Sequence, residues 1–111
     1  MRSVARPKPA PIDMFFLLGQ SVFRLDRTVI LRWWVSLEAS THPLATKVYR
    51  QFARYRGTAG NFAWFVFHDM AARDLIHATE ALADAGSLSR PEATQIQEGI
   101  LNATRPDGAW K

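Results

Sequence analysis

Apolar residues recur at steps of three and four along most of this chain, which is the spacing that places side chains on one face of an α-helix. The first run of this kind follows Asp13, a residue type that often caps helices. Its stripe consists of Phe15, Leu18, Val22, Leu25 and Val29. Arg24 and Arg27 fall on the opposite side, so the pattern predicts a helix over residues 13–39.

Residues 28–35 leave a second interpretation open. Their sequence, Thr-Val-Ile-Leu-Arg-Trp-Trp-Val, is rich in β-branched and aromatic residues, which are common in strands. A lone strand would need a partner strand, and the chain offers none. We therefore expect a helix here, with a bend near Gly19 or an end before the tryptophans as variants of it.

Two more helical stretches are bounded by residues that begin or end helices. A second helix is expected from Pro43, which suits the first turn, to about Arg56. A third and longer helix is expected from Asn61, as its N-cap, to about Gly86, which suits the position just after a helix. The glycines in segment 57–60 separate these two helices.

The fourth helix begins at Ser89-Arg90-Pro91-Glu92, which has the sequence of a capping box with proline in the first turn. We expect it to end near Thr104. Together the four stretches predict an all-α fold, a small four-helix domain with short connections that occupies residues 12–111. Short connections favour antiparallel neighbouring helices.

Residues 1–11 are expected to form an extended, flexible and basic arm in front of this domain. Three prolines exclude a regular helix and favour a polyproline-like conformation. They are Pro7, Pro9 and Pro11. The basic residues of the arm are Arg2, Arg6 and Lys8. Such an arm either remains disordered or lies along an anionic partner.

The composition narrows the class of protein. The 111 residues suit a single domain, and the absence of cysteine excludes disulfides and thiolate chemistry. We expect a cytoplasmic protein, because a cysteine-free chain suits a reducing compartment. The most apolar stretch, 14–37, is interrupted by charged residues and predicts no transmembrane span. A helix lying in a membrane surface would use the apolar stripe that the core needs, so this interpretation ranks third.

Charge is divided unequally between the two parts of the chain. Residues 1–60 contain ten basic and three acidic residues, a net charge of +7, whereas residues 61–111 contain four basic and seven acidic residues, a net charge of −3. A region of one sign attracts partners of the opposite sign. The asymmetry therefore indicates binding of an anionic partner rather than catalysis.

A basic stripe lies on the second predicted helix. Lys47, Arg50 and Arg54 share one helical face, and Arg56 follows at its end. Such a face predicts contacts with phosphate groups, with Tyr49 as a ring that could stack on a base. An ordinary solvated helix face is the alternative, and the basic arm in front of the domain argues against it.

Aromatic residues supply a second candidate surface. The chain has more large aromatic side chains than a small four-helix core readily encloses, and two consecutive tryptophans point about 100° apart on one helix. We expect some of these residues to contact another protein or a second copy of the chain. The residues expected at this contact are Trp33, Trp34, Phe62, Trp64 and Phe65. A large core that encloses them is the alternative.

No catalytic, cofactor-binding or metal-binding motif stands in the sequence. His68 and His77 are nine residues apart, which places them on opposite sides of a helix and argues against a shared metal ion. We therefore expect a non-enzymatic binding protein, such as an adaptor, inhibitor or regulatory subunit, that uses the aromatic contact and is guided by the basic stripe. The alternative is a nucleic-acid-binding accessory protein that contacts phosphate through its basic N-terminal half.

Overall fold

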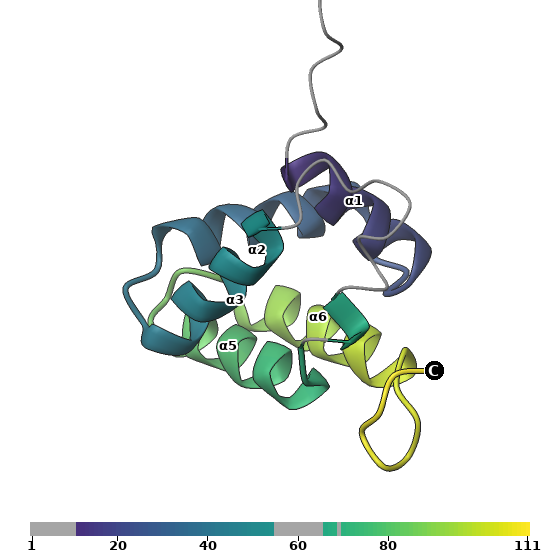
Figure 1. Ribbon diagram of the computed structural model, residues 1–111. Coiled ribbons are helices and arrows are strands. Elements are labelled where there is room, and N and C mark those ends of the chain that lie inside the picture. Colours follow the sequence, from purple (N-terminus) through teal and green to yellow (C-terminus); the bar gives the residue numbers. More distant parts are fainter. Residues whose placement is uncertain (1–10, 55–65, 69) are drawn as a thin grey trace, which may run out of the picture.

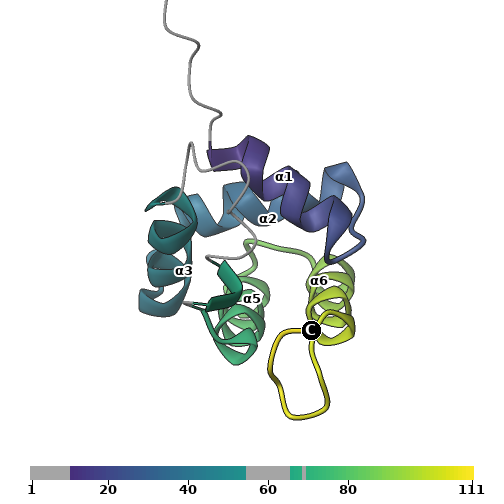
Figure 2. The same cartoon turned by 45° about the vertical axis from the view of Figure 1, so that its right-hand side comes forward.

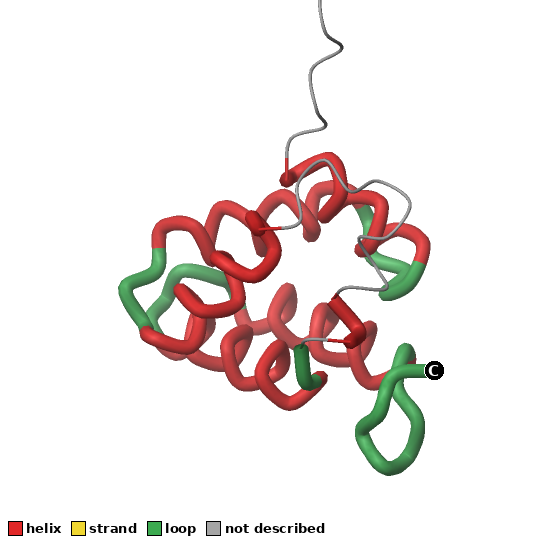
Figure 3. Tube along the Cα trace, viewed as in Figure 1, coloured by secondary structure: helices red, strands yellow, loops and turns green. Residues whose placement is uncertain are grey.

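The computed structural model of the protein describes residues 11–54, 66–68 and 70–111 (Figure 1). This part of the chain is all-α, and loops connect its helices (Figure 3). The longer helices are α1 (Pro11–Ser21), α2 (Arg27–Ala39), α3 (Pro43–Arg54), α5 (Ala72–Asp84) and α6 (Arg90–Asn102). The all-α prediction is confirmed, and within the described ranges five long helices stand where four were expected.

The first helix begins slightly earlier than the sequence suggests. α1 starts at Pro11, so the last residue assigned to the arm belongs to the helix. Proline suits the first turn because a backbone N–H at this position would have no hydrogen-bond partner within the helix. Asp13 lies within this first turn instead of capping it, where a negative charge favours the helix dipole. Residues 1–10 of the predicted arm lie outside the described residues.

The single helix predicted over residues 13–39 is instead two helices, α1 and α2, and this corrects the sequence analysis. Between them Arg24 has a left-handed backbone conformation with φ of 55°. The carboxylate of Asp26 accepts the backbone N–H groups of Thr28 at 2.8 Å and Val29 at 3.4 Å. This cap satisfies N–H groups that the helix itself cannot pair, so a new helix begins here.

Residues 28–35 form part of α2, which confirms the helical interpretation of that segment. α1 folds back onto α2, and the two helices approach closely at Gly19. A Cβ atom at this glycine would lie only 2.6 Å from Cδ1 of Ile30, so the absence of a side chain permits the approach. The break between the helices therefore lets both apolar stripes face one core.

The predicted third helix, 61–86, is interrupted in the described part of the chain. α5 begins only at Ala72, and Ala71 before it has an extended backbone with ψ of 140°. The apolar spacing continues through this interruption, so periodicity alone could not reveal it. The end is as expected, because Gly86 follows the helix with φ of 77°. Asn61, the predicted cap, lies outside the described residues.

α3 begins at Pro43 as predicted and is described as far as Arg54. His42 caps its start, because Nδ1 of this histidine accepts the backbone N–H of Leu44 at 3.2 Å. This cap fixes the start of α3 at the end of the short turn that links it to α2. The last two residues of the predicted helix, 55–56, lie outside the described residues.

α6 begins at the predicted capping box. The hydroxyl of Ser89 accepts the backbone N–H of Glu92 at 3.2 Å and lies 2.8 Å from its carboxylate oxygen Oε1. The helix ends at Asn102, close to the predicted end. The chain then turns back on itself, and Thr104 pairs with Trp110 in an antiparallel bridge.

The helices form two pairs that α3 joins. α1 packs on α2, α5 packs on α6, and α3 contacts both α2 and α5 (Figures 1 and 2). Their apolar stripes meet in one cluster of buried side chains. The largest fully buried members include Trp33, Phe15, Phe52, Leu18, Ile30 and Leu37. Polar contacts add to the packing: Nε2 of Gln97 on α6 donates to the carbonyl of Ile76 on α5 at 3.2 Å.

Candidate functional site

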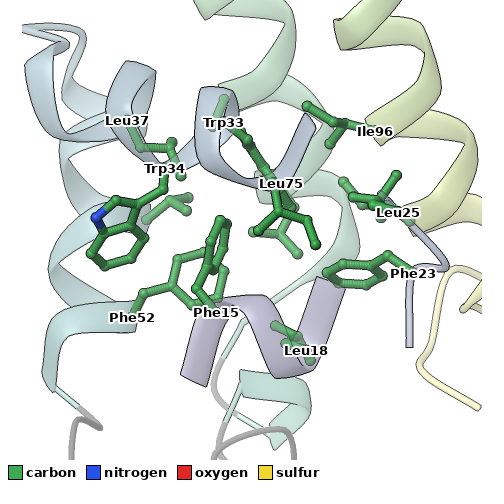
Figure 4. Packing of buried hydrophobic residues seen from close by; sticks show 14 of the residues in the cluster. Phe15, Leu18, Phe23, Leu25, Trp33, Trp34, Leu37, Phe52, Leu75 and Ile96 are labelled. Carbon is green, nitrogen blue, oxygen red and sulfur yellow. The ribbon is translucent and has the colours of Figure 1, made fainter. Parts of the chain in front are cut away.

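The candidate aromatic contact at Trp33 and Trp34 lies inside the core. Trp33 is completely buried, and Trp34 is only 7% exposed. The ring centroid of Phe15 lies 4.8 Å from the first ring and 5.1 Å from the second (Figure 4). The expectation that these two tryptophans form an exposed contact is therefore corrected, and the alternative of a large core holds for them. Outside the described residues lie the other members of the predicted contact, Phe62, Trp64 and Phe65.

Both tryptophans are enclosed because α2 is covered on two sides. On one side, α1 folds back and places Phe15 against Trp33. On the other side, α3 places the ring of Tyr49 4.9 Å from that of Trp34. A single helix over 13–39 could not turn back over its own stripe, so the break after α1 is what makes this burial possible.

Three basic residues of α3 are brought together on the surface. Lys47, Arg50 and Arg54 are exposed and line one hollow of about 550 Å³. These three residues form the basic row. The other described residues of the lining are uncharged, and they are Thr41, Pro43, Thr46 and Gln51. Outside the described residues lie the other members of the predicted basic face, Arg56, Arg2, Arg6 and Lys8.

The amphipathic pattern of α3 positions the basic row. The fully buried side chains of this helix are Ala45, Val48 and Phe52. A helix turns by about 100° per residue, so positions 47, 50 and 54 fall on the side away from the core and remain in solvent. This placement depends only on local spacing, and the structure brings the three side chains together as expected.

The cations of the basic row differ in their partners. Nζ of Lys47 lies 3.2 Å from Oδ2 of Asp74 on α5, in an ion pair that leaves 54% of the lysine side chain exposed. Within the described part of the chain, Arg50 and Arg54 have no acidic partner. The positive charge that is available to a ligand therefore lies mainly on the two arginines.

Tyr49 lies on the same helix as the basic row but is engaged inside the protein. Its hydroxyl donates to Oε2 of Glu38 at 3.0 Å, and its half-buried ring packs on Trp34. Burial, together with the Glu38 carboxylate, raises the pKa of Tyr49 above its usual value of 10.0. The ring is therefore not placed as a stacking surface for a base, which corrects that part of the expectation.

The acidic part of the chain is partly neutralised by its own basic residues. Arg90 donates to Glu80 at 2.7 Å and to Asp84 at 2.9 Å. Hydrogen bonds from Gln97 and Arg90 lower the pKa of the Glu80 carboxyl group. These contacts join α5 to α6. No group of three metal-ligating side chains occurs among residues 11–54, 66–68 and 70–111.

A second hollow, of about 720 Å³, lies between residues 67–68 and 70–72 on one side and residues of the segment 105–111 on the other. Arg105, Trp110 and Lys111 contribute to its lining, and sequence reasoning singled out none of them. The turn before Trp110 can be read from Pro106-Asp107-Gly108. Its contact with Met70, however, joins residues forty positions apart and depends on the tertiary fold.

None of the helices that the structure describes is long and apolar enough to cross a membrane. No protein-family model, no curated protein and no solved structure matches this chain.

Proposed function

We propose that this chain is a small non-enzymatic binding protein that contacts the phosphate backbone of nucleic acid through the basic row. One observation carries the proposal: Lys47, Arg50 and Arg54 lie on one exposed helix face, and none of the described residues that line their hollow is acidic. Arginine and lysine side chains supply many of the phosphate contacts in protein–DNA complexes. Such contacts fix the position of the protein on the backbone without reading the bases.

The burial of Trp33 and Trp34 changes the order of the two functions considered from the sequence. An adaptor that bound a partner through these tryptophans would have to open its own core. The basic row needs no such rearrangement, because its side chains are already exposed. Nucleic-acid binding therefore moves ahead of the aromatic contact.

The basic row has a length that suits a few phosphate groups. An α-helix rises about 1.5 Å per residue, so Lys47 and Arg54 are separated by roughly 10 Å along α3. Successive phosphates on one strand of B-DNA are separated by about 3.4 Å along the helix axis. A row about 10 Å long therefore has roughly three phosphates within its reach. Since Tyr49 is engaged internally, we expect little preference for single strands or for particular sequences.

The test compares binding of a short DNA duplex by the natural protein and by two double variants. Arg50→Glu/Arg54→Glu reverses the two arginines of the basic row that lack an acidic partner. Arg24→Glu/Arg27→Glu makes the same change in net charge at residues that do not line the hollow. At about 50 mM salt we expect the natural protein and this control to bind, and the first variant to lose binding.

Two outcomes would count against this function. Equal weakening by both double variants would show a response to net charge alone rather than to the basic row. Absence of binding by the natural protein at low salt would remove nucleic acid as the partner. Circular dichroism of each variant should match that of the natural protein, so that a loss of binding is not a loss of folding.

A protein partner is the second candidate, and one observation on α2 favours it. Leu31 and Val35 are 47% and 51% exposed, and they are four residues apart, so they form one apolar strip on the outer side of the helix. The adaptor interpretation then keeps an apolar contact but moves it away from the tryptophans. Sedimentation of the natural protein and of Leu31→Glu/Val35→Glu over a range of concentrations tests whether a second copy binds this strip.

The proposed function also includes a place in the cell. We place the protein in the cytoplasm, because a chain without cysteine needs no oxidising environment to fold. Fractionation of cells that express a tagged full chain tests this placement, and recovery in a membrane or secreted fraction would contradict it.

A further inference from the structure

Residues 104–111 fold back as a closed loop after α6. The N–H of Arg105 donates to the carbonyl of Ala109 at 2.6 Å, and the N–H of Gly108 donates to the carbonyl of Arg105 at 2.8 Å. Gly108 has φ of 84°, a conformation that glycine adopts without strain. Asp107 accepts the N–H of Ala109 through Oδ1 at 3.1 Å. The loop is therefore held by its own hydrogen bonds.

Trp110 anchors this loop to the helical body. Its indole Nε1–H donates to the carbonyl of Met70 at 2.7 Å, which is available because the helix is interrupted before α5. The centroid of its indole ring lies 4.7 Å from the ring centroid of Phe67 and 6.0 Å from the ring centroid of Phe23. The side chain of Trp110 therefore holds the loop on the helical body in two ways, through a hydrogen bond and through contacts between aromatic rings.

The hollow of about 720 Å³ lies between the anchored loop and residues 67–68 and 70–72. Its volume falls within the range of about 300–1,000 Å³ that is usual for small-molecule sites. Phe67 and Trp110 supply aromatic lining, and Arg105 and Lys111 supply positive charge. Among the described residues that line the hollow beside the basic row, none is aromatic, so the described linings of the two hollows differ in chemistry.

The charges around this hollow favour a negatively charged ligand. The side chains of Arg105 and Lys111 are exposed and have no acidic partner in the part of the chain that the structure describes. Asp107 also lines the hollow and keeps its negative charge while its Oδ1 accepts the N–H of Ala109, so the described side chains of the lining include two cations and one anion. The planar guanidinium of arginine matches the geometry of carboxylate and phosphate groups.

We propose that this hollow binds a small molecule in which a carboxylate or phosphate group is attached to a planar ring. Arg105 and Lys111 hold the oxyanion, while the planar ring lies against Phe67 and Trp110. The site is separate from the basic row and uses none of its residues. Its existence therefore does not depend on the nucleic-acid function proposed above.

The indole N–H of Trp110 provides a direct reporter for this site. Its nuclear magnetic resonance signal is identified by its loss in Trp110→Phe, and it is then followed while phenyl phosphate, benzoate or inorganic phosphate is added to the natural protein. We expect a saturable shift with phenyl phosphate or benzoate and weaker binding of inorganic phosphate. The tighter of the two aromatic probes identifies which oxyanion the site prefers.

A pair of double variants separates the site from general attraction of anions. Arg105→Ala/Lys111→Ala should weaken binding of the aromatic probe by about tenfold or more, because it removes charge-assisted hydrogen bonds. Arg50→Ala/Arg54→Ala removes the same charge from the basic row and should leave the affinity unchanged. The proposal is overturned if neither aromatic probe gives a saturable shift at millimolar concentration. It is equally overturned if inorganic phosphate binds as tightly or if the first variant binds as well as the natural protein.

Discussion

Trp33 is the largest fully buried side chain among the described residues, and it carries an unpaired polar group. It is enclosed by the rings of Phe15, Phe23 and Phe52. No described residue accepts its indole Nε1–H. A buried donor without a partner costs about 1–3 kcal/mol, so this tryptophan stabilises the fold through packing rather than through hydrogen bonding.

We predict that Trp33→Ala lowers the free energy of unfolding by about 3–5 kcal/mol, because it leaves a cavity in the core. Trp33→Phe should cost less, since it keeps a ring and removes the unpaired N–H. Urea unfolding measures both changes. Leu31→Ala, at a residue that is 47% exposed, is the control and should change the free energy by at most about 0.5 kcal/mol. Equal stability of Trp33→Ala and the control would contradict the enclosed position.

Glu80 makes the stability depend on pH. Hydrogen bonds from Gln97 and Arg90 lower the pKa of its carboxyl group in the folded state. The ionised carboxylate therefore contributes stability above the unfolded-state pKa, and this contribution is lost as the pH falls through the lower, folded-state pKa. In urea unfolding, the difference between the natural protein and Glu80→Gln should be largest near neutral pH and vanish in acid. Glu98→Gln, at an exposed residue of α6, should show no such trend, and the same trend in both variants would refute the assignment.

At the level of helices, local signals determine the ends and tertiary contacts determine the breaks. The starts at Pro43 and Ser89 and the end before Gly86 can be predicted, because caps, prolines and glycines act on neighbouring backbone groups. The break at 22–26 could not be predicted from periodicity, although Asp26 is a good cap, because apolar residues continue on both sides of it.

The same division explains which site residues the sequence reveals. The basic row follows from the spacing of Lys47, Arg50 and Arg54 on one helix, so it can be predicted without the fold. The burial of Trp33 and Trp34 depends on α1 turning back over α2. The second hollow depends on the contact of Trp110 with a backbone carbonyl far away in the sequence. Neither of these two features has a local signal.

The closest helix contacts predict an unequal response to two glycine substitutions. A Cβ atom at Gly99 of α6 would lie 2.6 Å from the backbone oxygen of Phe23, which cannot move without the link between α1 and α2. At Gly19 the obstacle is the side chain of Ile30 rather than a backbone atom, with Cδ1 and Cγ1 at 2.6 and 2.7 Å from the added Cβ atom. We predict that Gly99→Ala lowers the free energy of unfolding by about 1–3 kcal/mol and that Gly19→Ala lowers it less. Urea unfolding of both variants tests this order, and the reverse order would contradict the packing of α6 on the link.

At the level of the whole molecule, part of the charge asymmetry is used inside the fold. Lys47 pairs with Asp74 at 3.2 Å, and Arg32 approaches Glu92 at 3.9 Å, so two contacts join the basic and acidic parts of the chain. Exposed pairs of this kind contribute about 0–1 kcal/mol each. The pairs reduce the charge that a partner meets, but Arg50 and Arg54 remain without acidic partners in the described part of the chain.

Asp74 therefore competes with an anionic ligand for Lys47. We predict that Asp74→Asn tightens binding of a DNA duplex several-fold at low salt, because it releases one more cation for phosphate contact. The slope of log K against log salt should become more negative by about 0.9. The control is Asp84→Asn, which changes the net charge by the same amount. Asp84 pairs with Arg90, away from the basic row. Equal tightening by both variants would contradict the role of the ion pair.

The salt dependence of duplex binding by the natural protein tests the central claim most directly. If the basic row contacts two or three phosphates, log K should fall linearly with log salt between about 50 and 200 mM, with a slope of about −2 to −3. Arg50→Glu/Arg54→Glu should abolish this binding, and Arg24→Glu/Arg27→Glu should retain it. A slope near zero, or a slope unchanged by the Arg50→Glu/Arg54→Glu variant, would show that the basic row does not bind phosphate.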